Sequence, residues 1–354
     1  MPEIPSGPGR FATPQRDGRL VVSPSLQPGR FDSLAVDCPF VFSVDGRTGM
    51  TYVGWDGDGY QTALSWLEDE RWTPGELVLP RDPADPLTRW NAALTSILRE
   101  NDLWSGGELR RVGGWYLATF HAYPGAGYEA GPGSIGFLRS RDLHTWERVG
   151  GVLRPEDGAE WERGGLYKSW LLEHDGLFHL FYNAKQRDEW PWVEQTGLAV
   201  SHDLETWTRV SENPVLPVGA DGDFDEVFAS DPCVLRDGDQ WVMFYFGLAE
   251  DGHAREGVAT SPDLRTWTKS GDVLIDVGPE GAIDSLYAHK PAVVTRDGRL
   301  EHYYCAVARR PPHDVGDRQI TESRGITRAV RDLGAAAVHA LPVDETSTFR
   351  EDIA

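Results

Sequence analysis

Five short stretches at nearly constant spacing decide the fold of this chain, and they read Val44-Asp45-Gly46, Val112-Gly113-Gly114, His174-Asp175-Gly176, Arg236-Asp237-Gly238 and Arg296-Asp297-Gly298. The final glycines of these stretches lie 68, 62, 62 and 60 residues apart. Asp-Gly between apolar runs predicts a tight β-hairpin, because both residues tolerate the positive φ that the turn requires. The chain therefore repeats one hairpin-containing unit five times.

A second motif, Ser-x-Asp-Leu-x-Thr-Trp, follows the hairpin signal at 140–146, 201–207 and 261–267. Because its aspartates and tryptophans recur with the repeat, we expect them to form turns and to pack, and not to act on a ligand. Five copies of a four-stranded unit predict an all-β fold, a five-bladed β-propeller of four-stranded antiparallel blades.

The repeats predict one catalytic domain over residues 35–330. Residues 1–34 form an N-terminal segment that could complete the last blade, and residues 331–354 form a C-terminal tail. No apolar run approaches the ~20 residues that span a bilayer, and Met1 to Gly18 lacks the apolar core of a secretion signal. We therefore expect a cytoplasmic protein, in which Cys38, Cys233 and Cys305 are buried free thiols.

The net charge of −22 argues against nucleic acid or an anionic membrane as a partner. No ligand spacing typical of a metal site is present, so we expect no cofactor, with a structural cation in the central channel as an open alternative. The oligomeric state is not addressed by the sequence.

Counting back from each turn glycine identifies the residues that begin the inner strands, at the rim of the channel. Polar residues that differ between repeats occupy these equivalent positions, as in a site carried on a repeating scaffold. They are Asp37, Tyr167 and His289 at one offset, Lys168 and Lys290 one residue further in, and Asp231 in a blade whose register is one residue shorter.

Loops on the same face supply further candidates. Trp190-Pro191-Trp192 is expected to be exposed, and exposed aromatic side chains of this size usually bind ligands. Arg255 and Glu256 are expected to contact substrate. The other loop candidates are His121, Tyr123, Tyr128, Asn183 and Lys185, and a basic patch of Arg309, Arg310, His313 and Arg318 could bind an anionic group.

Asp-x-Pro strand starts combined with Ser-x-Asp-Leu-x-x-Trp turns resemble the five-bladed propeller glycosidases, above all the family 43 and family 32-like group, with families 117 and 130 as relatives. The resemblance implies that Asp37 is the general base or nucleophile and that Asp231 orients the acid or binds sugar hydroxyls. The Glu-Gly-Pro or Glu-Cys-Pro that carries the acid in the group is missing. Glu162 is the favoured acid, with Glu256 and His289 as alternatives.

The resemblance implies a glycoside hydrolase, in which one carboxylic acid protonates the leaving oxygen and one carboxylate acts on the other face of the sugar. We expect exo action on an oligosaccharide or glycoside, removing a terminal sugar that could be a furanose. Two alternatives stay open: a glycoside phosphorylase on the same fold, and a propeller that binds sugar without cleaving it.

Overall fold

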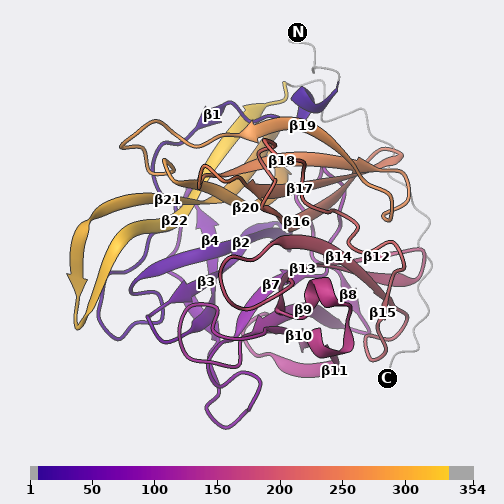
Figure 1. Ribbon diagram of the computed structural model, residues 1–354, viewed down its shortest axis with the longest axis horizontal. Helices are drawn as coiled ribbons and strands as arrows, with labels where there is room; N and C mark the ends of the chain where they lie inside the picture. The colour runs from indigo at the N-terminus through magenta and orange to yellow at the C-terminus, as the bar shows by residue number, and fades with distance from the viewer. Residues whose placement is uncertain (1–6, 335–354) are drawn as a thin grey trace.

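The computed structural model describes residues 7–334, and nearly all regular structure in this range is β-strand (Figure 1). The helices in this range are three short 3₁₀ segments, Pro8–Phe11, Pro155–Asp157 and Glu160–Glu162. No helix in the described part of the chain is long and apolar enough to cross a membrane. The expected all-β class is confirmed.

The described strands form three sheets, and the 12-stranded one consists of three antiparallel units joined by single parallel bridges. The antiparallel ladders thus define five units. The first contains β2 (Ala35–Val44), β3 (Arg47–Trp55) and β4 (Tyr60–Glu68), with β5 (Arg71–Trp72) and β6 (Glu76–Leu79) paired to β4. The second contains β7 (Ala93–Ile97), β9 (Trp115–Ala122), β10 (Ser134–Ser140), β11 (Glu147–Leu153) and the short β8 (Arg111–Val112). The third contains β12 (Gly165–His174), β13 (Leu177–Lys185), β14 (Glu194–Ser201) and β15 (Thr208–Arg209). The fourth contains β16 (Phe228–Asp237), β17 (Gln240–Leu248), β18 (Ala254–Ser261) and β19 (Thr268–Ile275).

The fifth unit is closed by the N-terminal segment. It contains β20 (Tyr287–Arg296), β21 (Arg299–Val315) and β22 (Arg318–Asp332), and β1 (Gln15–Arg16) pairs with β22. The segment 1–34 thus supplies the fourth strand of this unit. Of the tail expected at 331–354, residues 335–354 lie outside the described residues.

The hairpin signal lies where expected in four units and one residue later in the fourth. In that unit β16 runs on to Asp237, which pairs with Gln240, and the turn consists of Gly238 and Asp239. Gly238, at φ 61°, supplies the positive φ at the first turn position, as a glycine-led hairpin turn requires. This shift explains the shorter register that the sequence shows in this blade.

The Ser-x-Asp-Leu-x-Thr-Trp segments form turns and pack between blades, as expected. Asp142 Oδ1 accepts hydrogen bonds from the backbone N–H groups of His144 and Thr145, both at 2.8 Å. In the next copy the ring of Trp207 stacks on Phe137 of the preceding blade, with centroids 4.8 Å apart. These aromatic contacts join neighbouring blades.

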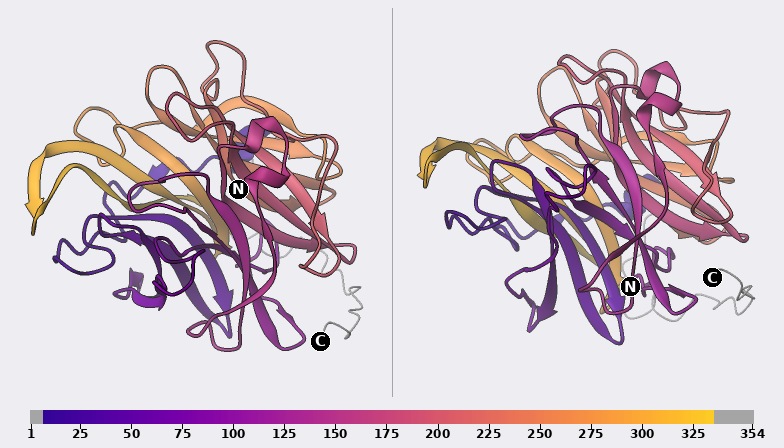
Figure 2. Two further views of the ribbon diagram at one scale, coloured as in Figure 1. Left: turned by 60° about the horizontal axis from the view of Figure 1, so that its bottom comes forward. Right: turned by 90° about the horizontal axis from the view of Figure 1, so that it is seen from below.

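The last hairpin extends beyond the other strands as an arm, residues 309–322, which is seen at the golden end of the chain in Figures 1 and 2. At its tip Arg318 donates a hydrogen bond of 2.7 Å to Asp58 of the first unit. Arg324 lies on β22 two residues beyond the arm and lines the cavity at the channel mouth.

The central channel is filled below its mouth by Arg99, which follows β7 and is fully buried. Its guanidinium donates to the carbonyl oxygens of Val41 and Val293, the latter at 3.0 Å, and lies 4.9 Å from the ring centroid of Trp170. These contacts link three other blades.

Candidate active site

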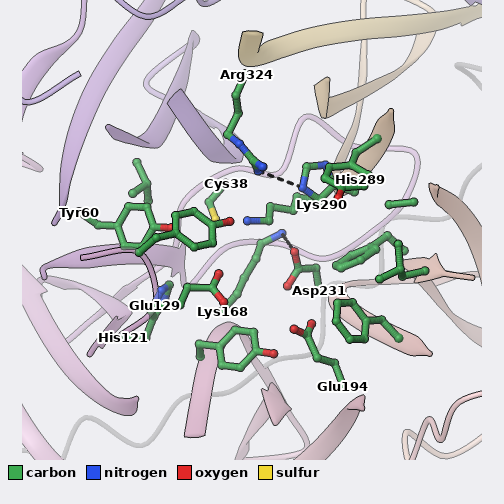
Figure 3. A pocket seen from close by; sticks show the side chains of 18 of the residues that line it. Cys38, Tyr60, His121, Glu129, Lys168, Glu194, Asp231, His289, Lys290 and Arg324 are labelled. Carbon is green, nitrogen blue, oxygen red and sulfur yellow. Dashed lines mark hydrogen bonds and ion pairs between the residues drawn. The ribbon is translucent and has the colours of Figure 1, made fainter. Parts of the chain in front are cut away.

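A cavity of about 460 Å³ occupies the mouth of the channel, where the inner strands begin (Figure 3). All five units contribute to its wall. The polar and charged residues that line it are Tyr60, His121, Tyr123, Tyr128, Glu129, Tyr167, Lys168, Glu194, Asp231, Tyr287, His289, Lys290, Glu322 and Arg324. Its size suits a sugar ring with part of a leaving group.

A β-bulge at the same place in every inner strand builds the floor of this cavity. The extra residue is Cys38, Thr95, Lys168, Asp231 or Lys290, in chain order. Cys38, Asp231 and Lys290 have positive φ values of 50°, 58° and 65°. A bulge turns the side chain of its extra residue away from the regular alternation, and four of these five side chains line the cavity.

Asp37 lies beneath this lining and is held by two cations. Its Oδ2 accepts hydrogen bonds from Lys290 Nζ at 2.8 Å and Arg324 Nη1 at 3.2 Å, and its Oδ1 accepts one from the backbone N–H of Cys38 at 2.8 Å. Burial opposes ionisation, but these two positive charges hold the pKa of Asp37 well below its usual range. The carboxylate therefore anchors Lys290 and Arg324 and is poorly placed to take a proton or attack a sugar.

His289 is part of the same cluster and is uncharged. Its Nδ1 lies 3.0 Å from the carbonyl oxygen of Cys305, which accepts its proton, and its Nε2 faces Arg324 Nη1 at 3.4 Å. Burial and the charge of Lys290 push the pKa of His289 well below its usual value. In this arrangement Nε2 carries no proton to donate, which argues against the alternative of His289 as the acid.

One group within residues 7–334 has the spacing of metal ligands, Asp37, His289 and Cys305, whose candidate atoms lie within 4.8 Å of one another. Lys290 and Arg324 already lie against Asp37, so a metal ion would face two positive charges. Burial also raises the pKa of the Cys305 thiol well above its usual value. The group does not fit a cation.

Asp231 is fixed by a two-point contact with Asn183. The Nδ2 group of Asn183 donates a hydrogen bond to Asp231 Oδ1. The Oδ1 atom of Asn183 accepts a hydrogen bond of 2.6 Å from the backbone N–H of Asp231. The other oxygen of Asp231 lies 3.9 Å from Lys168 Nζ and has no hydrogen-bond partner, nor does that ammonium group. Burial raises the pKa of Asp231. An acceptor and a donor that share only a long ion pair thus line the cavity side by side, and a ligand hydroxyl would give both a hydrogen bond.

Glu194, at the start of β14, was not predicted and has the properties of an acid. Its Oε1 accepts the indole N–H of Trp192 at 2.8 Å, and its Oε2 contacts the hydroxyl of Ser230 at 3.0 Å. Burial, followed by the charge of Glu129, raises the pKa of Glu194 to about 7. A carboxyl group with such a pKa is protonated at neutral pH in a useful fraction of molecules.

Glu129, on the loop between β9 and β10, is the second carboxylate that was missed. It is half-buried at the cavity wall, and Figure 3 shows it beside Lys168, facing the space that Glu194 also faces. Burial raises the pKa of Glu129, while the charges of Lys290 and Lys185 lower it. The pKa of Glu129 is raised overall, as that of Glu194 is, but the two cations limit the rise at Glu129.

The structure places Glu162 away from the cavity, which makes the favoured acid assignment wrong. Its Oε2 accepts hydrogen bonds from Arg209 Nε at 2.9 Å and the Tyr182 hydroxyl at 3.1 Å, and its Oε1 accepts the backbone N–H of Ala159 at 2.9 Å. A carboxylate satisfied on both oxygens caps its 3₁₀ turn and joins it to the third blade.

Glu256 and Arg255 also lie outside the cavity lining. Glu256 is fully buried between blades against His302. Arg255 forms ion pairs with Asp251 at 2.6 Å and Asp276 at 2.8 Å at the edge of the fourth blade. The expectation that both residues contact substrate is therefore wrong.

The remaining candidates divide between the cavity and the surface. Those that line the cavity are His121, Tyr123, Tyr128, Tyr167, Lys168, Trp190, Trp192, Asp231, His289 and Lys290, whereas Asn183 and Lys185 are buried outside the lining. The basic patch of Arg309, Arg310, His313 and Arg318 lies on the arm and contributes nothing to the lining. The three cysteines are buried and free, as expected.

A carboxylate-lined pocket at the mouth of a propeller channel defines a glycosidase-type site. Residues 108–282 match the family model described as the Glycosyl hydrolases family 32 N-terminal domain. The chain is therefore similar to the propeller-fold glycosidases, the group that includes family 32.

Two solved structures align with 96% of this chain and 96% of their own. BT0996, solved in a complex with RGII, has 28% identity and a TM-score of 0.75. A protein named glycoside hydrolase has 26% identity and a TM-score of 0.72. Both likenesses extend over the whole propeller.

Curated relatives match a smaller part of the chain. A probable sucrose-6-phosphate hydrolase of Psychromonas ingrahamii is 32% identical over 149 residues, 40% of this chain and 26% of its own length. A 1,2-beta-oligomannan phosphorylase of Thermoanaerobacter sp. is 27% identical over 140 residues, 37% of this chain and 46% of its own length. The chain thus spans between about a quarter and about half of these relatives.

Proposed function

We propose that the protein is an exo-acting glycoside hydrolase in which Glu194 is the general acid and Glu129 is the catalytic carboxylate. The observation that carries this proposal is the difference in electrostatic surroundings between two carboxyl groups on the wall of one cavity. Burial raises the pKa of both carboxyl groups; Glu129 adds to this effect at Glu194, whose pKa is about 7, whereas Lys290 and Lys185 oppose it at Glu129. A pair with such a difference supplies one acid and one base.

In this mechanism Glu194 transfers its proton to the glycosidic oxygen as the bond between that oxygen and the anomeric carbon breaks. Glu129 either removes a proton from the water that attacks the anomeric carbon, or attacks that carbon itself and is later released by water. The anomeric configuration of the first product distinguishes these two courses. Asp231 and Lys168 hold sugar hydroxyls through their unpaired oxygen and ammonium group.

Exo action is supported by the closure of the channel. Arg99 fills it below the cavity, and Tyr128 and Arg324 stand at the mouth on the side of the arm. A chain end fits such a pocket, whereas the middle of a long polysaccharide would need an open groove.

A phosphorylase is the second candidate, because one relative is a 1,2-beta-oligomannan phosphorylase. The cations offer little support for phosphate binding, since Lys290 is engaged by Asp37 and the basic patch of Arg309, Arg310, His313 and Arg318 does not line the cavity.

The experiment is a panel of 4-nitrophenyl furanosides and pyranosides, together with RGII, with and without inorganic phosphate. Wild type is compared with Glu194→Gln and Glu129→Gln. Hydrolysis of one glycoside without phosphate, lost in the Glu129 variant, is the expected result. Turnover that requires phosphate would show that the protein is a phosphorylase. Full activity in both variants would overturn the assignment of Glu194 and Glu129 as the catalytic pair.

A further inference from the structure

One side of the cavity is lined mainly by large aromatic and aliphatic side chains, although the same blades also contribute Glu194, Asp231 and His289. We call this side the aromatic wall, and its members come from the third, fourth and fifth blades: Trp190, Trp192, Phe228, Phe246, Leu248 and Tyr287. The side formed by the first and second blades carries hydroxyl, imidazole and carboxyl groups instead, with Tyr60, His121 and Glu129 labelled in Figure 3. The cavity thus presents two different surfaces to a ligand.

The rings of the wall hold one another in place. Trp192 stacks on Phe228 at an interplanar angle of 11°, and Trp190 meets the ring of Trp192 edge-on with centroids 5.2 Å apart. Phe246 meets Phe228 at 81°. Trp190 nevertheless leaves 63% of its surface exposed at the cavity rim. A large aromatic surface that is rigid and exposed beside a pocket is typical of a preformed contact for an apolar group.

Trp192 links this wall to the acid, because its indole N–H donates to Glu194. A general acid protonates the oxygen between the sugar and its leaving group, so the leaving group must lie on the side of Glu194. We propose that the aromatic wall is the leaving-group subsite, and that it takes leaving groups with an apolar face: a 6-deoxy sugar or an aryl aglycone. This inference rests on the proposed role of Glu194.

Binding of free leaving groups tests the wall without requiring turnover. The probes are two pairs of sugars that differ only in a hydroxyl on C6, L-fucose with L-galactose and L-rhamnose with L-mannose, and the aryl probe is 4-nitrophenol. Their affinities are measured by ligand-observed NMR for wild type, Trp190→Ala and Trp90→Ala. Trp90 is a matched control, an exposed tryptophan (37%) outside the cavity.

We expect a 6-deoxy sugar to bind about tenfold more tightly than its hydroxylated counterpart, or 4-nitrophenol to bind while all four sugars do not. The reason is that a wall made mainly of rings offers a C6 hydroxyl few polar partners. The first outcome identifies a deoxy sugar and the second an aryl group. Trp190→Ala should remove the preference and Trp90→Ala should keep it.

Two results would overturn the inference. One is equal binding of both members of each sugar pair with no binding of 4-nitrophenol, and the other is a preference that survives in Trp190→Ala. If the glycoside panel shows Glu194-dependent turnover at the same time, the proposed function stands and only the leaving-group subsite is wrong. Apolar preference in a protein inactive on the whole panel would instead contradict the proposed function, and with it the leaving-group role of the wall.

Discussion

Trp192 donates its indole N–H to Oε1 of Glu194 at 2.8 Å, so one ring both forms part of the aromatic wall and stabilises the carboxylate form of the proposed acid. This hydrogen bond lowers the pKa of Glu194 against the larger effect of burial. The pKa of the proposed acid thereby stays near neutral pH, where the group can release its proton.

Trp192→Phe should raise the pKa of Glu194 further, because it removes the donor and keeps an aromatic ring. The alkaline limb of the kcat/KM profile should move to higher pH, while its acid limb should stay in place. The measurement is a pH profile of kcat/KM for both proteins on the glycoside that wild type cleaves. An unchanged alkaline limb would mean that another group titrates there.

The raised pKa of Glu194 also predicts how stability depends on pH. A carboxyl group with an ordinary pKa of 4.5 and a folded-state pKa of about 7 binds its proton more tightly in the folded protein, so stability from this group is complete below the ordinary value and is lost as pH rises to about 7. The free energy of unfolding should therefore fall less between pH 5 and pH 8 in Glu194→Gln than in wild type, as measured by denaturant unfolding at both pH values. Equal losses would show that Glu194 keeps an ordinary pKa.

Asp37→Asn should destabilise the protein by about 3–5 kcal/mol, because it leaves Lys290 and Arg324 buried without their shared carboxylate. Activity should fall with it, since both cations line the cavity. Denaturant unfolding and kcat/KM are measured on the same preparation. An inactive variant with wild-type stability would restore the catalytic role that the family resemblance implies for Asp37.

Glu162→Gln should lower the free energy of unfolding by about 1–3 kcal/mol while leaving kcat/KM unchanged, because it weakens buried hydrogen bonds far from the cavity lining. The variant is a useful control for Glu194→Gln, since both changes replace a buried glutamate by its amide in the third blade region. A selective loss of kcat in Glu162→Gln, at wild-type stability, would return this residue to the site.

The repeat pattern of the sequence predicts the propeller because turn chemistry is local. Asp-Gly and Ser-x-Asp-Leu-x-Thr-Trp each close a turn within a few residues, so their positions alone set the phase of every blade. Counting from the turns also finds Lys168, Asp231 and Lys290, since the bulges repeat with the blades. Only Gly238-Asp239 shifts a turn, because glycine can take the first turn position there as well as the second.

The carboxyl pair is harder to predict because neither member begins an inner strand. Glu129 lies on an irregular loop with no counterpart in the repeat. Glu194 begins a third strand and is equivalent to Ala254, since each forms the single parallel bridge to the next blade. Aligning the third strands places Glu194 level with Ala254 of the cavity lining, whereas Glu256 lies two residues further along its strand, against His302 between blades.

Acid catalysis by Glu194 is tested most directly by the effect of leaving-group acidity. Glycosides of one sugar with 2,4-dinitrophenol and with a plain alcohol are compared in wild type and Glu194→Gln. The variant should lose about 10²–10⁴-fold in kcat/KM on the alcohol glycoside and far less on the dinitrophenyl glycoside, because dinitrophenolate departs without a proton. An equal loss on both substrates, or no loss on either, would contradict the assignment of Glu194 as the acid.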